Sequence, residues 1–131
     1  MVFYMKLTLD SIGPAHRIRR YDVGSVTVNE TVFTRTLLLT PEHIDTAWGP
    51  EALAELTEGH LDSLIELGPE IVLIGTGRYQ AFPERRLMVR AIQAGLGLEV
   101  MTTEAACRTY NILAAEQRRV AAVLFMIENE S

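Results

Sequence analysis

The feature that most constrains the fold is a run of apolar residues that ends in a glycine turn. Residues Ile71-Val72-Leu73-Ile74 carry no polar side chain, and Gly75-Thr76-Gly77 follows at once. A strand with one solvated face alternates apolar and polar side chains, so a continuous run is typical of a strand buried on both faces. We therefore expect a sheet in the middle of the molecule with further structure covering each face.

The second half of the chain supplies helices and strands around this run. An apolar i, i+3, i+4 pattern over residues 61–65 predicts a helix that ends before Gly68-Pro69. Pro83 suits the first residue of another helix, which should end at Gly95 or Gly97. The remaining expected elements are a strand over Leu98–Met101, a helix capped by Thr102 or Thr103, and a strand over Val120–Ile127.

The first half of the chain is rich in strand patterns instead. Residues 25–28 alternate in polarity, and the residues after 31 are rich in β-branched and apolar types. Asn29 tolerates a positive φ, so residues 29–31 suit a hairpin loop. The expected strands are Arg17–Tyr21, Ser25–Val28, Val32–Leu39 and a shorter one over His43–Ala47, before the break at Trp48-Gly49-Pro50.

These patterns together predict the fold class. Strands separated by helices favour a three-layer α/β domain with a central mixed sheet and helices packed on it. The strand-rich opening then forms an N-terminal β-hairpin extension. A chain of 131 residues suits one domain spanning residues 1–131.

Charge and composition narrow the classes of partner and compartment. Acidic groups outnumber basic ones by 17 to 12, which disfavours nucleic acid as a partner. The longest apolar stretch, residues 120–127, is far shorter than the roughly 20 residues that a membrane span needs. Cys107 has no cysteine to pair with, and Met1–Asp10 contains no apolar stretch suited to a signal peptide. We therefore expect a soluble, cytoplasmic protein.

The glycine turn after the buried strand has two interpretations. At the carboxyl end of a strand, backbone N–H groups of such a turn can bind an anion. The dinucleotide fingerprint is incomplete, however, because Gln80 stands where its third glycine belongs, and no Gly-Lys-Ser/Thr phosphate loop occurs. The other interpretation, which we favour, is a tight turn in which a glycine adopts a positive φ.

The segment Met101–Leu113 is the most distinctive in the chain. On a helix, one stripe at i, i+4, i+7 and i+11 would face the sheet and consist of Ala106, Tyr110, Leu113 and Gln117. The polar residues beside it either line a pocket or tie the helix to its neighbours by hydrogen bonds, and we favour the second role. The ligand-site alternative, for an anion or nucleotide, uses Gly75, Thr76, Gly77, Arg78, Thr102, Thr109, Asn111 and Glu116.

Catalytic and metal sites are not expected from the residues. A helix N-terminus and Arg108 would favour the thiolate of Cys107, but no histidine lies near it in sequence, so a small buried group is expected. No pair of histidines or cysteines stands at metal-ligand spacing. We therefore expect no cofactor, no metal and no enzyme activity, with an unrecognised enzyme kept under the ligand-site alternative.

Several short motifs in the second half occur in an order that resembles a known family. They are Ile71–Gly77, Gly97–Met101 with Thr103, Ala106-x-x-Thr109-Tyr110-Asn111-x-Leu113, and Glu116-x-Arg118-x-Val120-Ala121-Ala122. The chain resembles a former domain of unknown function whose eukaryotic members are the mitochondrial NADH dehydrogenase (complex I) assembly factor three proteins, alongside uncharacterised bacterial and archaeal relatives.

The resemblance implies a compact α/β fold with a mixed sheet. It also implies a non-enzymatic interaction protein that assists assembly of respiratory NADH dehydrogenase, with complex subunits or assembly factors as protein partners. No catalytic residue is attached to the family pattern.

Overall fold

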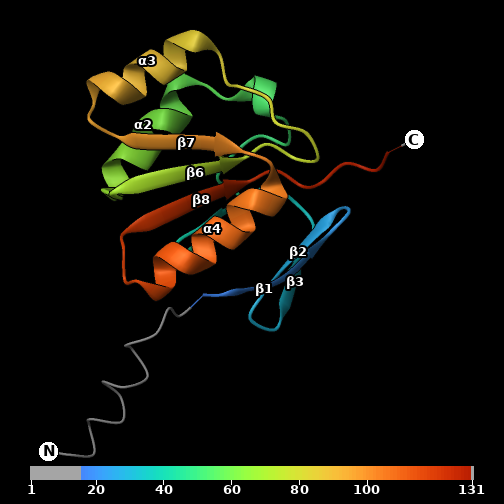
Figure 1. The fold of residues 1–131 in the computed structure, drawn as a ribbon. Helices are drawn as coiled ribbons and strands as arrows, with labels where there is room; N and C mark the ends of the chain where they lie inside the picture. The colour runs from blue at the N-terminus through green and yellow to red at the C-terminus, as the bar shows by residue number, and fades with distance from the viewer. Residues whose placement is uncertain (1–15, 131) are drawn as a thin grey trace, which may run out of the picture.

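A five-stranded mixed sheet with the strand order β5-β4-β8-β6-β7 forms the middle of the molecule. Figure 1 shows β8, β6 and β7 of this sheet side by side. The computed structural model describes residues 16–130, so the signal-segment prediction for Met1–Asp10 lies outside the described residues. β6 pairs in parallel with β7 and β8, whereas β4 is antiparallel to β8 and β5. The bounds are β4 Leu37–Leu39, β5 Ile44–Asp45, β6 Ile71–Gly75, β7 Gly97–Met101 and β8 Val120–Leu124.

Helices cover both faces of this sheet, as Figure 1 shows. One face carries α2 (Glu58–Leu67) and α3 (Arg85–Gln93), and the other carries α4 (Thr103–Ala115). Along β6, Val72 and Ile74 belong to the core beneath α2 and α3, while Leu73 belongs to the core beneath α4. The apolar run is therefore buried on both faces, and the predicted three-layer α/β class is confirmed.

A second, smaller sheet lies beside α4 and forms the predicted N-terminal extension. β1 (Ile18–Asp22), β2 (Ser25–Val28) and β3 (Thr31–Phe33) are antiparallel in that order. Val26 and Val28 of β2 are buried in the core that contains α4. The extension is thus a three-stranded sheet. The hairpin loop predicted at residues 29–31 forms the turn between β2 and β3.

The expectation of one strand over Val32–Leu39 was wrong. β3 ends at Phe33, and Leu37–Leu39 forms β4 in the other sheet, antiparallel to β8. All three leucines of β4 are buried, whereas β3 is mostly exposed. The physical reason is that this leucine triplet buries more apolar surface inside the central sheet than it could on the small one, so the chain changes sheets between them.

Other boundaries shift by a few residues for local reasons. α3 begins at Arg85 rather than at Pro83, because the carbonyl of Glu84 is the first to accept helical hydrogen bonds. It ends as predicted, with Gly95 at φ +73° just beyond it. β8 ends at Leu124 rather than at Ile127, because its neighbour β6 ends at Gly75, the residue that pairs with Leu124. The N–H of Phe125 makes the last hydrogen bond between the two strands, to the carbonyl of Gly75.

A short 3-10 helix and the two ends of α2 complete the described part of the fold. η1, a 3-10 helix over Leu53–Glu55, precedes α2. α2 begins with a capping box in which the hydroxyl of Thr57 accepts from the backbone of His60 while the His60 ring accepts from the backbone of Thr57. It ends at Gly68, which adopts the left-handed conformation, φ +70°.

Candidate functional site

The first glycine of the turn lies where β6 passes close to the first turn of α4. A Cβ on Gly75 would stand 2.8 Å from the Cα of Thr103 and 3.0 Å from the Cβ of Ala106. Because the nearer contact is a backbone atom, no side-chain rotation would relieve it. Glycine at this position therefore lets the helix pack against the strand.

The second glycine meets the expectation of a positive φ. Gly77 has φ +101°, a conformation that side-chain-bearing residues rarely adopt. Its N–H donates to the hydroxyl of Thr103 over 2.8 Å, and its carbonyl accepts from the N–H of Thr103 over 3.0 Å. A Cβ on Gly77 would overlap the carboxylate of Glu128. The turn is therefore locked to α4 on one side and to the C-terminal segment on the other.

Thr103 joins three segments that are distant in sequence. Its side chain is fully buried, and its hydroxyl accepts from Gly77 while donating to the carbonyl of Phe125 over 2.6 Å. Sequence reasoning did not include Thr103 among the candidate site residues, although it stands in one of the family motifs. Its neighbour Thr102 is the N-cap of α4, accepting from the N–H of Ala105 over 3.2 Å.

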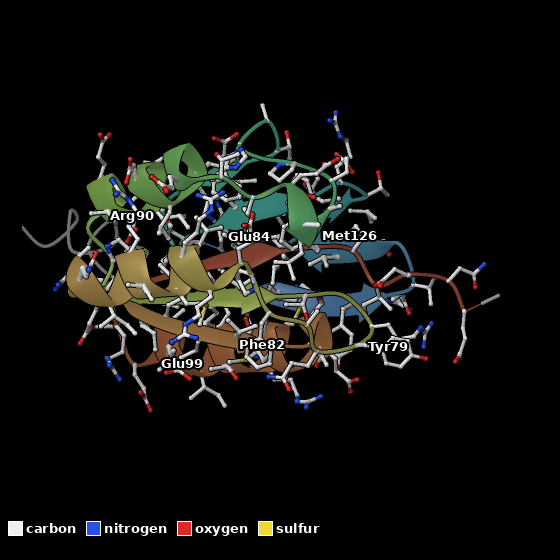
Figure 2. The ribbon with its side chains drawn as sticks, turned by 90° about the horizontal axis from the view of Figure 1, so that it is seen from above. Tyr79, Phe82, Glu84, Arg90, Glu99 and Met126 are labelled. Atoms are coloured by element: carbon white, nitrogen blue, oxygen red, sulfur yellow. The ribbon has the colours of Figure 1, made fainter. Side chains whose placement is uncertain are left out.

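Arg78 holds the C-terminal segment against the turn. Its backbone N–H donates to Oε1 of Glu128 over 2.7 Å, and its Nε donates to the carbonyl oxygen of Glu128 over 2.9 Å. Tyr79, labelled at this end of the molecule in Figure 2, donates its hydroxyl to Glu130 over 2.8 Å. The turn therefore does bind a carboxylate, and that carboxylate belongs to the same chain.

The eight residues of the ligand-site alternative do not form one site. Gly75, Thr76, Gly77, Arg78 and Thr102 meet at the carboxyl ends of β6 and β7, where the hydroxyl of Thr76 donates to the carbonyl of Tyr79 over 2.7 Å. The other three lie farther along α4, and Glu116 is its C-cap at the opposite end of the helix, roughly 20 Å away.

Asn111 ties α4 to the small sheet. Its Oδ1 accepts from the N–H of Ile18 over 2.9 Å, and its Nδ2 donates to the carbonyl of Ile18 over 2.8 Å. This pair of bonds satisfies backbone groups at the edge of β1. Thr109, on the same helix, is half-buried. For Asn111 the structure agrees with the favoured interpretation, a hydrogen bond between the helix and its neighbour.

Cys107 is buried in the core beneath α4, with 1% of its surface exposed. Burial raises the pKa of the Cys107 thiol to about 12, and the opposing effect of the nearby Arg108 charge is smaller. The thiol is therefore protonated at neutral pH. Within residues 16–130 no group of histidine, cysteine, aspartate and glutamate side chains is arranged to hold a metal ion.

The buried thiol should react slowly with thiol reagents. We expect little labelling of Cys107 by an aromatic disulfide reagent in the native protein at pH 8, and one equivalent in denaturant, because only the thiolate attacks and the side chain is inaccessible. Cys107→Ala should fold and lower the free energy of unfolding by about 1 kcal/mol. Rapid labelling of the native protein would contradict both the burial and the raised pKa.

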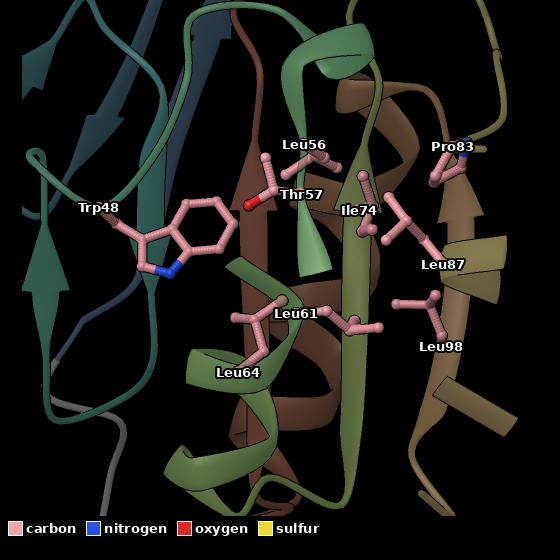
Figure 3. A pocket seen from close by; sticks show the side chains of 9 residues that line it. All are labelled: Trp48, Leu56, Thr57, Leu61, Leu64, Ile74, Pro83, Leu87 and Leu98. Atoms are coloured by element: carbon pink, nitrogen blue, oxygen red, sulfur yellow. The ribbon is translucent and has the colours of Figure 1, made fainter. Parts of the chain in front are cut away.

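A small cavity lies on the other side of the sheet, between α2, α3 and the strands β6 and β7 (Figure 3). Its volume is about 10 Å³, close to what one water molecule requires. The lining is mainly apolar: Trp48, Leu56, Thr57, Leu61, Leu64, Ile74, Pro83, Leu87 and Leu98. It has no room for a nucleotide, so the turn at residues 75–78 is the better candidate site.

Comparison with known proteins places this arrangement in a family. The family model described as "Protein of unknown function (DUF498/DUF598)" matches residues 18–125, which include both sheets and all the turn residues. The chain belongs to this family. The resemblance indicated by the motif order is thus confirmed at the level of this family of unknown function.

Solved structures resembling this DUF498/DUF598 protein share its fold over most of its length. The Xanthomonas campestris protein XCC1710 is 34% identical with a TM-score of 0.80, and the similarity covers 92% of each chain. A Bordetella pertussis protein described as a Mth938-like domain is 27% identical with a TM-score of 0.75, and that similarity covers 89% of each chain.

A further relative carries a membrane-related name. The "13 kDa major membrane protein" of Francisella tularensis subsp. holarctica is 35% identical over 72 residues, which cover 55% of this chain and 58% of that protein. The chain thus matches little more than half the length of that relative. Over residues 16–130, no helix is both long enough and apolar enough to cross a bilayer.

Proposed function

We propose that this DUF498/DUF598 protein is a non-enzymatic interaction protein of the cytoplasm that assists assembly of the respiratory NADH dehydrogenase. The observation that carries the interaction role is a loop with two exposed aromatic side chains. Tyr79 and Phe82, 61% and 66% exposed, project from the segment between β6 and α3 (Figure 2). Aromatic residues are enriched in protein interfaces and often carry most of the binding energy.

The chemistry around this loop also favours an interaction role over catalysis. The hydroxyls of Thr76, Thr102 and Thr103 are engaged in hydrogen bonds that hold the backbone together. The thiol of Cys107 is buried and protonated. The choice of NADH dehydrogenase as the assembled complex rests on the family resemblance alone.

Loss of the gene should lower the amount of intact NADH dehydrogenase in a host that makes this complex. We expect a several-fold decrease in the assembled complex on native gels and in NADH oxidation by membranes. The wild-type gene should restore both, whereas Tyr79→Ser/Phe82→Ser should not, because the exposed aromatic contact is lost.

The matched control is Ile112→Ala, which removes an equally exposed apolar side chain, 59% exposed, from α4. This variant should rescue as the wild type does. Normal complex levels in the deletion strain would contradict the assembly role, and rescue by the double serine variant would contradict the role of the loop.

The second candidate is a small-anion binding module, and one observation favours it. The turn after β6 binds the carboxylate of Glu128 through the backbone N–H of Arg78. If free anions were the natural ligand, acetate or inorganic phosphate at millimolar concentration should raise the melting temperature of the wild-type protein.

A further inference from the structure

Residues 125–130, which follow β8, form an extended segment that we call the strap. It lies at the carboxyl ends of the central strands. After β8, the carbonyl of Phe125 accepts from Thr103, and Ile127 forms a parallel bridge with Val23 of the small sheet. The N–H of Gly24 donates to the carbonyl of Ile127 over 2.8 Å. The strap thus lies between the turn of the central sheet and the β1–β2 turn of the small one.

The side chains of the strap are held by charge and by shape. Oε1 of Glu128 accepts a hydrogen bond from the backbone N–H of Arg78. The guanidinium of Arg78 lies 4.0 Å from the carboxylate of Glu130. Gly77 has no side chain, which leaves room for the Glu128 carboxylate. Hydrogen bonds that involve an ionised group are roughly twice as strong as neutral ones. Arg78 therefore binds both the side-chain carboxylate and the backbone carbonyl of Glu128.

The contacts that hold the strap are nevertheless partly exposed to solvent. Glu128 and Glu130 are exposed, and 28% of the Arg78 side chain remains accessible. Exposed segments with few buried contacts open locally at a small fraction of the global unfolding free energy. The strap can therefore detach while both sheets stay folded.

We infer that Gly77, Arg78 and the β1–β2 turn form a binding site, called the seat here, for an extended peptide. In this structure Glu128 of the same chain occupies the seat. An acidic extended segment of a partner protein replaces the strap when the partner binds. The strap itself indicates the chemistry of the occupant: an extended segment that carries a glutamate. Addition of an extended peptide to an exposed strand is a recurring mode of recognition. This inference rests on the proposed function only in assigning the segment to a partner protein.

The internal strap competes with any added peptide. A segment tethered next to its seat acts at an effective concentration in the millimolar range, so the wild-type protein should bind a free peptide weakly. Removing the carboxylates of the strap should relieve this competition without removing the seat.

The test is a titration of a fluorescently labelled synthetic peptide, Leu-Phe-Met-Ile-Glu-Asn-Glu, which copies residues 124–130. The full-chain variant Glu128→Ala/Glu130→Ala should bind it at least tenfold more tightly than the wild type does. Adding Arg78→Ala to that variant should remove the gain. A control peptide with glutamine in place of both glutamates should bind at least tenfold more weakly to the double variant.

Each outcome decides the inference. Equal affinity of the wild type and the double variant, or equal affinity for the two peptides, would overturn it. Competition by free acetate as effective as that by the acidic peptide would also overturn it, because the extended backbone would then contribute nothing. If the double variant fails to show a cooperative melting transition, the isosteric Glu128→Gln variant replaces it in the same comparison.

The result is independent of the assembly experiment. Peptide binding by purified protein involves no NADH dehydrogenase, so the seat can be demonstrated even if the deletion strain assembles that complex normally. Conversely, an assembly defect without peptide binding would leave the proposed function standing and would refute the seat.

Discussion

Gly75→Ala should lower the free energy of unfolding by about 3 kcal/mol, a large share of the stability of a domain of this size. The added methyl group would stand 2.8 Å from the Cα of Thr103, so β6 and α4 would have to move apart. That movement would loosen the core beneath α4, which contains Ala106 and Tyr110. Urea unfolding followed by circular dichroism measures the loss.

Gly95→Ala is the matched control for this substitution. Gly95 lies just after α3 with φ +73°, and a Cβ there would meet no atom within 4 Å. Its replacement should cost about 1 kcal/mol, from the left-handed backbone alone. If the two alanine variants lose the same stability, close approach of strand and helix is not what requires glycine at position 75.

Thr103→Val is expected to destabilise the protein by about 3 kcal/mol. Valine keeps the shape of the side chain but removes the hydroxyl, which leaves the N–H of Gly77 and the carbonyl of Phe125 without this partner. A buried polar group that loses its partner costs about 1–3 kcal/mol. Thermal and urea unfolding both measure the difference.

Thr103→Ser separates the hydrogen bonds from packing. Serine keeps the hydroxyl and loses only a methyl group, so the cost should be about 1 kcal/mol. A serine variant as unstable as the valine variant would mean that the methyl group, and not the hydroxyl, holds the turn to α4.

Part of the site could be predicted from local sequence. A buried strand must end in a turn, and a Gly-x-Gly sequence directly after it indicates a backbone that bulkier residues cannot adopt, as Gly77 confirms with φ +101°. The cap of α4 by Thr102 follows from the preference of threonine for that position. Both features involve residues within a few positions of one another.

Other parts of the site depend on contacts that local patterns do not contain. Glu128 reaches Arg78 from 50 positions away, and Asn111 reaches Ile18 from 93 positions away. A glutamate near a chain end or an asparagine on a helix carries no local signal of such a partner. The ligand-site alternative treats Asn111 and Glu116 as polar groups of one pocket with the turn, whereas their positions along α4 separate them from it.

The layers of this protein follow from side-chain periodicity, whereas the connections between the layers follow from long-range contacts. Continuous apolar character in residues 71–74 requires cover on both faces, and helical periodicity identifies what provides it, because both depend only on the direction of successive side chains. The transfer of Leu37–Leu39 to the central sheet and the seating of Glu128 beside Gly77 have a different origin. Each depends on which segments, distant in sequence, bury more apolar surface against one another or pair opposite charges. Those segments meet only in the folded chain.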